Sequence, residues 1–338
     1  MMLSDRFFKK GREFLNVRYP FLAGAMTWVS TPGLVAAVCN AGGFGCLAGG
    51  NAPVDTLKEQ VEETRRQTDK PFGVNIITIA PLYHEHLALV KEMRLPYIIF
   101  AGSFPREKEV KLVKESGAKI LCFASTLSIA RRMLSYGADA LILEGMEAGG
   151  HVGHVSLAVL LQQVLFKVAE VPVFIAGGIA TGKMCAYMFL MGAAGVQLGT
   201  RFALSEECCV HPRFKEKLLK AKARDAVSTP QFDSRLPVVA VRTLRNKGLD
   251  DFGKLQLDLI RRLDEGSLHR SKAQEQVETY WMGALRRAVI DGDTAHGSLM
   301  AGQSVGLINN IKSIKDIMAD LVHETEEELA RVHRVLCA

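Results

Sequence analysis

The sequence predicts an α/β protein, a (β/α)8 TIM barrel with an inserted smaller helical domain. Short apolar runs of strand length alternate with helical segments eight times before Ser205. Several helices end in a glycine just before the next strand, as at Gly117 and Gly192. Strictly alternating units with apolar strands indicate a parallel sheet. Eight such units fit a closed barrel, so this fold is expected.

An open, doubly wound sheet is the alternative architecture for the same alternation. Its dinucleotide-binding form carries a GxGxxG motif at the first strand–helix turn. Here that turn reads GAMTW from Gly24 to Trp28, which does not match the motif. The closed barrel is therefore favoured.

The elements follow in order along the chain. Thr31 and Pro32 indicate a helix start, as an N-cap and a proline at the first helical position. Ser156 is a second expected N-cap. We expect strands at residues 19–23, 44–48, 72–76, 97–100, 119–122, 140–143, 172–175 and 195–198, and helices at 31–40, 53–68, 82–93, 105–116, 126–136, 156–169 and 181–191.

The character of the chain changes near Ser205. Residues 206–296 carry charged helical segments without strand–helix alternation, and apolar character returns at Gly297. We therefore predict a barrel from residues 1–205 and 297–338 and a helical substrate or lid domain from residues 206–296. A long amphipathic helix is expected to run to the C-terminus.

The composition of the chain excludes several classes of protein. The 338 residues are 48% hydrophobic and 23% charged, with a net charge of +6. No apolar run reaches the roughly 18 residues of a membrane span, and the N-terminus does not resemble a secretory signal. The seven cysteines show no metal-ligand spacing, and no nucleic-acid motif appears. We expect a cytoplasmic homodimer without a metal or nucleic-acid partner.

A glycine-rich loop follows the sixth expected strand. Glu144, Glu147 and His151 lie in it together with Gly149 and Gly150. Glycines let a flat ligand approach the backbone, and barrels place their chemistry in loops after strands. His151 is therefore the candidate catalytic residue, against the alternative of a flexible loop with a surface histidine.

Two further glycine-rich turns follow the seventh and eighth strands. The first contains Ala176, Gly177 and Gly178, and the second contains Gly199 and Thr200. Loops at these positions of a barrel often bind phosphate through backbone N–H groups. Thr200 and the next residue, Arg201, are expected to add donors. Glycines that only pack helices against strands are the alternative.

A phosphate site at these turns suits flavin mononucleotide (FMN), with its ring over the barrel mouth. Asn75 and Gln197 are polar residues at strand ends, and Asn75 is also interpretable as a strand-terminating asparagine. A phosphorylated sugar would fit the same pattern. The ring would lie near Ala25, Met26 and Asn75, with Glu144 and Gln197 at neighbouring strand ends. The glycine-rich turns would contribute Gly149, Gly150, Ala176, Gly177, Gly178, Gly199 and Thr200.

The segment EGMEAGGHVG at residues 144–153 resembles the signature loop of the nitronate monooxygenase-like FMN barrel superfamily. Within it, the chain most resembles the flavin-dependent enoyl-acyl-carrier-protein reductases of bacterial type II fatty acid synthesis. Supporting segments are KPFGVN at 70–75, AGGIA at 176–180, QLGTRF at 197–202 and SLMAGQ at 298–303. The likeness covers nearly the whole chain.

The resemblance implies an FMN-binding TIM barrel with a smaller substrate domain. It implies that NADH or NADPH reduces FMN, which then passes hydride to an enoyl double bond. His151 would be the catalytic-site histidine, while Met300 and Gln303 would border the flavin. The chain departs from the family at His154, where a lysine or another residue is common, and Ala295-His296 matches no family pattern.

Two other activities remain open at this point. A nitronate monooxygenase could use the same histidine as a base or as a hydrogen-bond donor to a nitro group. A barrel isomerase or lyase could act on a phosphorylated substrate without flavin. Lysine and arginine clusters in the insertion suit an acidic carrier protein, or are a solvated helix surface. These clusters are Arg213, Lys215, Lys217, Lys220, Lys222 and Arg224, and Arg242, Arg245 and Lys247.

Overall fold

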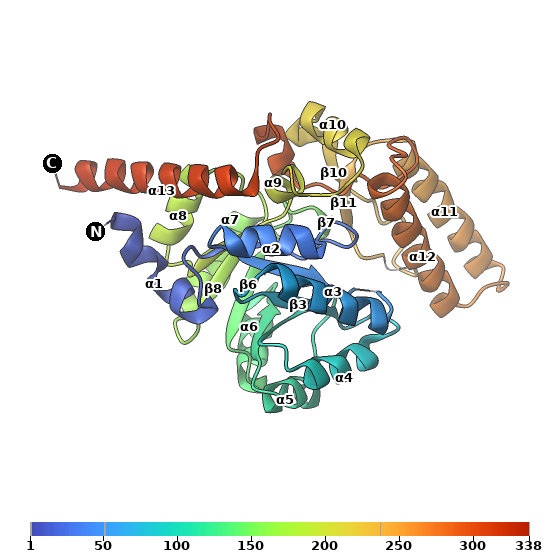
Figure 1. Ribbon diagram of the computed structural model, residues 1–338. Helices are drawn as coiled ribbons and strands as arrows, with labels where there is room; N and C mark the ends of the chain where they lie inside the picture. Colours follow the sequence, from blue (N-terminus) through green and yellow to red (C-terminus); the bar gives the residue numbers. More distant parts are fainter. Residues whose placement is uncertain (1, 51, 237, 338) are drawn as a thin grey trace.

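The barrel is closed and parallel. The computed structural model describes residues 2–50, 52–236 and 238–337, and in them eight strands form one barrel (Figure 1). In barrel order these are β1 (Phe21–Ala23), β2 (Phe44–Ala48), β3 (Gly73–Ile77), β4 (Tyr97–Ala101), β5 (Lys119–Phe123), β6 (Ala140–Glu144), β8 (Val173–Ala176) and β9 (Gly195–Leu198). Since β9 pairs with β1, the predicted (β/α)8 barrel is confirmed.

Helices cover the outside of the barrel. They are α1 (Leu3–Leu15), α2 (Pro32–Asn40), α3 (Val54–Gln67), α4 (Tyr83–Met93), α5 (Glu107–Glu115), α6 (Leu127–Tyr136), α7 (Leu157–Gln163), α8 (Gly182–Leu190) and α13 (Ile314–Leu336). The C-terminal helix α13 packs on α8, where Thr325 Oγ1 donates to the Gly182 carbonyl at 3.0 Å. The helix expected over 156–169 is shorter than predicted, because it stops at Gln163 and gives way to a 3-10 turn, Leu165–Lys167.

The inside of the barrel is apolar up to the last layer of side chains. The buried inner cluster includes Leu22, Phe44, Cys46, Ile99, Leu121, Ile142 and Phe174. Side chains of a strand alternate between its two faces, so residues two apart share a face. Asn75, Glu144 and Gln197 therefore point inward at the carboxyl ends of β3, β6 and β9. They form a polar layer above the apolar core.

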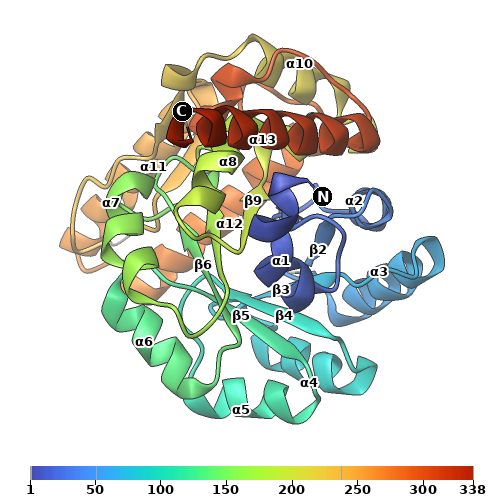
Figure 2. The same cartoon turned by 90° about the vertical axis from the view of Figure 1, so that its left-hand side faces the viewer.

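Helix α1 closes the amino-terminal end of the barrel (Figure 2). The Phe14 carbonyl accepts hydrogen bonds from Tyr97 Oη at 2.9 Å and from Lys119 Nζ at 2.5 Å. The Phe14 ring lies 5.9 Å from Phe174 and 6.2 Å from Tyr97. This helix was not predicted from the sequence. The closed end leaves the carboxyl ends of the strands as the open mouth.

The insertion is mainly helical but also contributes strands that were not predicted. Its elements are α10 (Pro212–Lys220), β10 (Ala226–Ser228), β11 (Val241–Leu244), α11 (Lys247–Asp264) and α12 (Arg270–Val289), with a 3-10 turn at Ala223–Asp225. A further 3-10 turn, Gln303–Leu307, follows in the return segment. Phe252, Leu259, Val277 and Trp281 form a core of its own. Figure 1 shows α11 and α12 beside the barrel. The short helix α9 (Thr200–Ala203) precedes it.

Three further findings concern the described residues as a group. None of their helices has the length and apolar character needed to cross a membrane. Their seven cysteines are all free thiols, and Cys209 and Cys337 are the exposed ones. No three of their His, Cys, Asp or Glu side chains gather in a way that could hold a metal ion.

Candidate functional site

The polar layer at the mouth has unused hydrogen-bonding capacity. Glu144 is in register with Ala176, and Ala176 with Gln197, so these positions lie side by side across β6, β8 and β9. No described residue hydrogen-bonds to the side chains of Asn75, Glu144 or Gln197, although Asn75 is only 7% exposed. Burial raises the pKa of Glu144 to about 8. Its carboxyl group is therefore mostly neutral at pH 7 and can donate a hydrogen bond.

The turns after β8 and β9 form a concave stretch of glycine backbone, the cradle, made by Gly177, Gly178 and Gly199. Gly177 and Gly178 have φ of +93° and +72°, which L side chains rarely adopt. A Cβ at Gly177 would lie 2.9 Å from the Gly145 carbonyl oxygen, so only glycine fits there. No described residue accepts a hydrogen bond from the N–H groups of Gly177, Gly178 or Gly199. Free N–H groups in such turns suit an anion such as a phosphate.

Thr200 and Arg201 differ in their relation to this cradle. Thr200 Oγ1 accepts a hydrogen bond from Gly302 N at 3.0 Å and keeps its own proton to donate. Arg201 bonds instead to Asn310 and to the Leu204 carbonyl. Expecting Arg201 to be a phosphate donor was therefore wrong, because its guanidinium ties the end of β9 to the return segment.

His151 lies on a short strand rather than in a flexible loop. The strand β7 (Gly150–His151) pairs antiparallel with β11 of the insertion, with His151 opposite Val241. Val152 N also donates to the Ala240 carbonyl at 2.9 Å. The strand order is β10-β11-β7, so the insertion holds the histidine in place. The segment is therefore a paired strand and not a flexible loop, although His151 itself is exposed at the surface, as the alternative had it.

A carboxylate from the insertion lies close to the His151 ring. His151 Nε2 is 4.0 Å from Glu278 Oε2 on α12, and both side chains are partly exposed, at 44% and 41%. Desolvation among neighbouring groups lowers the pKa of His151, and the charge of Glu278 acts in the opposite direction. Sequence reasoning missed Glu278, since one glutamate in a charged helix gives no signal.

Glu147, grouped with His151 in the sequence, has a structural role. Its carboxylate accepts hydrogen bonds from Leu157 N at 3.0 and 3.2 Å and so caps helix α7. Ser156, the expected cap, makes no side-chain cap hydrogen bond. The Glu147 backbone carbonyl accepts from Gln303 N at 2.9 Å. Glu147 is thus committed to the shape of the loop.

The return segment completes the site from the other side. Met300 packs against both the barrel core and the core of the insertion, and it bridges to Thr243. A Cβ at Gly149 would lie 2.5 Å from Ala301 C, so the loop needs glycine where the return segment crosses it. The structure therefore brings Gly149, Gly150, Met300 and Gln303 together.

The loop after β1 borders the second glycine turn. Gly24 N donates to the Leu198 carbonyl at 3.1 Å, which brings the following Ala25 to the end of β9. A Cβ at Gly199 would lie 3.6 Å from Met26 Sδ. Trp28, in the same loop, has φ of +66° and is 46% exposed. This conformation is unusual for a bulky residue, and no sequence pattern predicted it.

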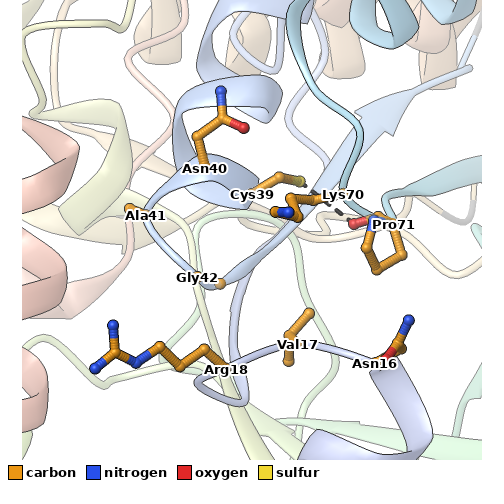
Figure 3. Close-up of a pocket in the computed structure, with 10 residues that line it drawn as sticks. Asn16, Val17, Arg18, Cys39, Asn40, Ala41, Gly42, Lys70 and Pro71 are labelled. Carbon is orange, nitrogen blue, oxygen red and sulfur yellow. Dashed lines mark hydrogen bonds between the residues drawn. The ribbon is translucent and has the colours of Figure 1, made fainter.

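A hollow of about 310 Å³ lies at the opposite, amino-terminal end of the barrel. Segments that precede the strands line it, and Figure 3 shows its residues. The polar ends of Asn16, Arg18 and Asn40 point in different directions there. Because no polar groups converge, this hollow is a weaker candidate than the mouth.

Comparisons with known proteins agree with this geometry. The chain matches the family described as nitronate monooxygenase over residues 9–86 and 77–324. The chain belongs to the nitronate monooxygenase family. It is 31% identical, over 92% of this chain and 94% of the other, to (3aS,4S,5R,7aS)-5-hydroxy-7a-methyl-1-oxo-octahydro-1H-indene-4-carboxyl-CoA dehydrogenase of Mycobacterium tuberculosis.

Two solved structures are also similar to this chain. FabK from Thermotoga maritima is 38% identical with a TM-score of 0.85, covering 96% of this chain and 98% of that one. Nitroalkane oxidase from Streptomyces ansochromogenes is 26% identical with a TM-score of 0.78, covering 94% and 98%. The family and these neighbours identify a flavin oxidoreductase. FMN dependence is a property of this family, and the free N–H groups of the cradle fit a phosphate.

Proposed function

We propose that the protein is an FMN-dependent enoyl thioester reductase that uses NADH or NADPH and acts on trans-2-enoyl chains carried by acyl carrier protein. The observation that carries the proposal is His151, fixed by the pairing of β7 with β11 beside the polar mouth. A structural likeness to the enoyl-acyl-carrier-protein reductase FabK supports it. The Mycobacterium relative also acts on a thioester, by its name.

The residues proposed to hold FMN come from five strands or the loops after them, and from the return segment. The N–H groups of Gly177, Gly178 and Gly199 and the Thr200 hydroxyl would bind its phosphate. Asn75, Glu144 and Gln197 would offer hydrogen bonds to its ring. The remaining contacts would come from Ala25, Met26, Gly149, Gly150, Ala176, Met300 and Gln303. When bound, FMN would supply the redox chemistry that relays hydride from the nicotinamide to the alkene.

His151 is proposed to serve the enoyl step. Hydride addition to the β-carbon of an enoyl thioester develops negative charge on the thioester oxygen. A hydrogen-bond donor fixed at that oxygen lowers the barrier. An imidazolium can donate from either ring nitrogen, so protonated His151 suits this role.

The insertion is proposed to form the substrate lid and to receive the carrier protein. Residues 206–296 leave the barrel after α9 and reach its mouth again through β11 and the return segment. Arg213, Lys217, Lys220 and Arg224 on and after α10 are exposed, and no described carboxylate lies within 4.0 Å of their charged groups. Such unpaired cations suit an acidic partner.

Nitronate oxidation is the second candidate, favoured by the family match and the nitroalkane oxidase neighbour. In that reaction His151 would act on the nitro group instead. The same fold and the same histidine serve both reactions, so substrate turnover must decide between them.

A side-by-side assay tests the proposal. The purified protein is given an enoyl thioester with NADH or NADPH, and separately an alkyl nitronate with oxygen. We expect nicotinamide oxidation that depends on the enoyl thioester, and little oxygen uptake with the nitronate. Rapid nitronate consumption without enoyl turnover would assign the oxidase reaction. Protein that is colourless and takes up no FMN would exclude both reactions and favour a flavin-free isomerase or lyase.

A further inference from the structure

We infer that Glu278, on the insertion helix α12, is a positioning residue that keeps the proton on His151 during turnover. The inference deepens the proposed function and rests on it. The two residues come from different parts of the molecule, since His151 is on β7 and Glu278 is on α12. Their nearest ring nitrogen and carboxylate oxygen are 4.0 Å apart.

Packing within the insertion fixes the position of Glu278. Its neighbour Val277 and the following Trp281 are 2% and 3% exposed, in the core of the insertion. The Trp281 ring packs on Phe252 of α11, with centroids 4.3 Å apart. Because both residues lie on one side of α12, the carboxylate of Glu278 is directed away from that core. The strand pairing described above brings His151 to it.

The other charged groups near His151 are already committed or face elsewhere. Arg242, on β11, donates to the carbonyls of Met146 and Ala226. The Glu147 carboxylate caps α7, and His154 in the same loop is exposed. The return segment contributes uncharged Met300. Among the described residues, Glu278 is thus the carboxylate that faces the imidazole.

Two opposing effects act on the protonated ring. Desolvation favours neutral imidazole and lowers the pKa of His151, and the negative charge of Glu278 favours the imidazolium. Without Glu278 only the lowering effect remains. The donor form would then be lost at a lower pH. At a separation of about 4 Å, even full solvent screening gives a shift of roughly 0.7 pH unit.

The test is a histidine NMR titration of the full chain, without substrate, in three forms. These are wild type, Glu278→Gln and Glu275→Gln, with the His151 signal assigned from its loss in His151→Gln. Glu275 is the matched control, because it lies on the same helix but pairs with Lys272 at 2.7 Å. We expect Glu278→Gln to lower the pKa of His151 by about 0.7 unit or more. Glu275→Gln should leave it unchanged, and Glu278→Asp should restore part of the shift.

The pH profile of the enoyl step is the second readout. Its alkaline limb should move to lower pH in Glu278→Gln by the same amount, while flavin reduction by the nicotinamide stays unchanged. An unchanged His151 titration in folded Glu278→Gln would overturn the inference. Failure of wild type to reduce enoyl thioesters would overturn the proposed function instead, and the NMR titration would still report on the pair.

Discussion

The two ends of the barrel differ in whether their polar groups have hydrogen-bond partners. At the amino-terminal end, α1 covers the barrel, and Tyr97 and Lys119 both bond to the carbonyl of Phe14. At the carboxyl end, Asn75, Glu144 and Gln197 have no described partner, and three glycine N–H groups are free. Satisfied polar groups stabilise a fold, while unsatisfied ones are retained where a ligand completes them.

This difference makes the hollow at the amino-terminal end a weaker candidate site than the mouth. The hollow lined by Arg18 and Asn40 lies where the polar groups diverge. The mouth instead gathers donors at fixed positions from several strands. Ligand binding depends more on convergent, unused hydrogen-bonding groups than on empty volume, because these groups fix the orientation of the ligand.

The largest effect is expected from a side chain that fills the glycine turn after β8. Gly178→Val places a β-branched side chain at φ of +72°, with its Cβ 3.2 Å from Glu147 Cβ. We expect purified Gly178→Val to contain no FMN and to take up none, as measured by absorbance and fluorescence titration, while circular dichroism still shows a folded barrel.

Gly192→Val is the matched control at the opposite end. Gly192 has φ of +101°, and a Cβ there meets nothing within 4 Å. It should lose about 1 kcal/mol or more of unfolding free energy through backbone strain and keep its FMN. If Gly178→Val keeps full flavin occupancy, the cradle is not the phosphate site.

His151→Ala should separate the two halves of the catalytic cycle. Losing one fixed donor to a developing oxyanion costs on the order of 3 kcal/mol, or about 100-fold in rate. In stopped flow, flavin reduction by the nicotinamide should stay near normal, and oxidation by the enoyl thioester should slow about 100-fold. Equal slowing of both halves would mean that His151 positions the flavin or the nicotinamide.

Glu144→Gln should change how stability depends on pH. The pKa of Glu144 is about 8 in the folded state and near 4.3 when unfolded. Between these values the unfolded chain has lost the proton that the folded chain keeps, so wild-type stability falls as pH rises. Allowing for partial exposure, we expect this fall to be on the order of 2 kcal/mol.

Denaturant unfolding at pH 5 and pH 9 measures the effect. Glutamine does not titrate, so the difference in stability between variant and wild type should grow in favour of the variant at pH 9. A difference that is the same at both pH values would show that Glu144 is ionised in the folded protein.

Tyr97→Phe tests the closed end and should have the smallest effect. It removes the hydrogen bond from Tyr97 Oη to the Phe14 carbonyl, which Lys119 still serves. The loss of unfolding free energy should be about 1 kcal/mol. FMN affinity and the enoyl rate should not change, and a change in either would show that the two ends are coupled.

The sequence was sufficient for the barrel and for much of the mouth. Short continuous apolar runs, each followed by small residues, located β1 to β9 apart from β7, as well as the turns at Gly177 and Gly199. It did not reveal β7 or β11. A two-residue strand has no periodicity, and its partner lies far along the chain. Glu278 was missed and Arg201 was assigned the wrong role for the same reason, because the roles of both depend on tertiary contacts.

The pairing of His151 with Val241 also has a consequence for biosynthesis. Both glycine turns and all eight barrel strands precede residue 205, so a growing chain contains them before the insertion is translated. The strand that holds His151 gains its partner only when β11 has been made. In the order of synthesis, the glycine turns that would bind the flavin phosphate are therefore complete before His151 gains its strand partner.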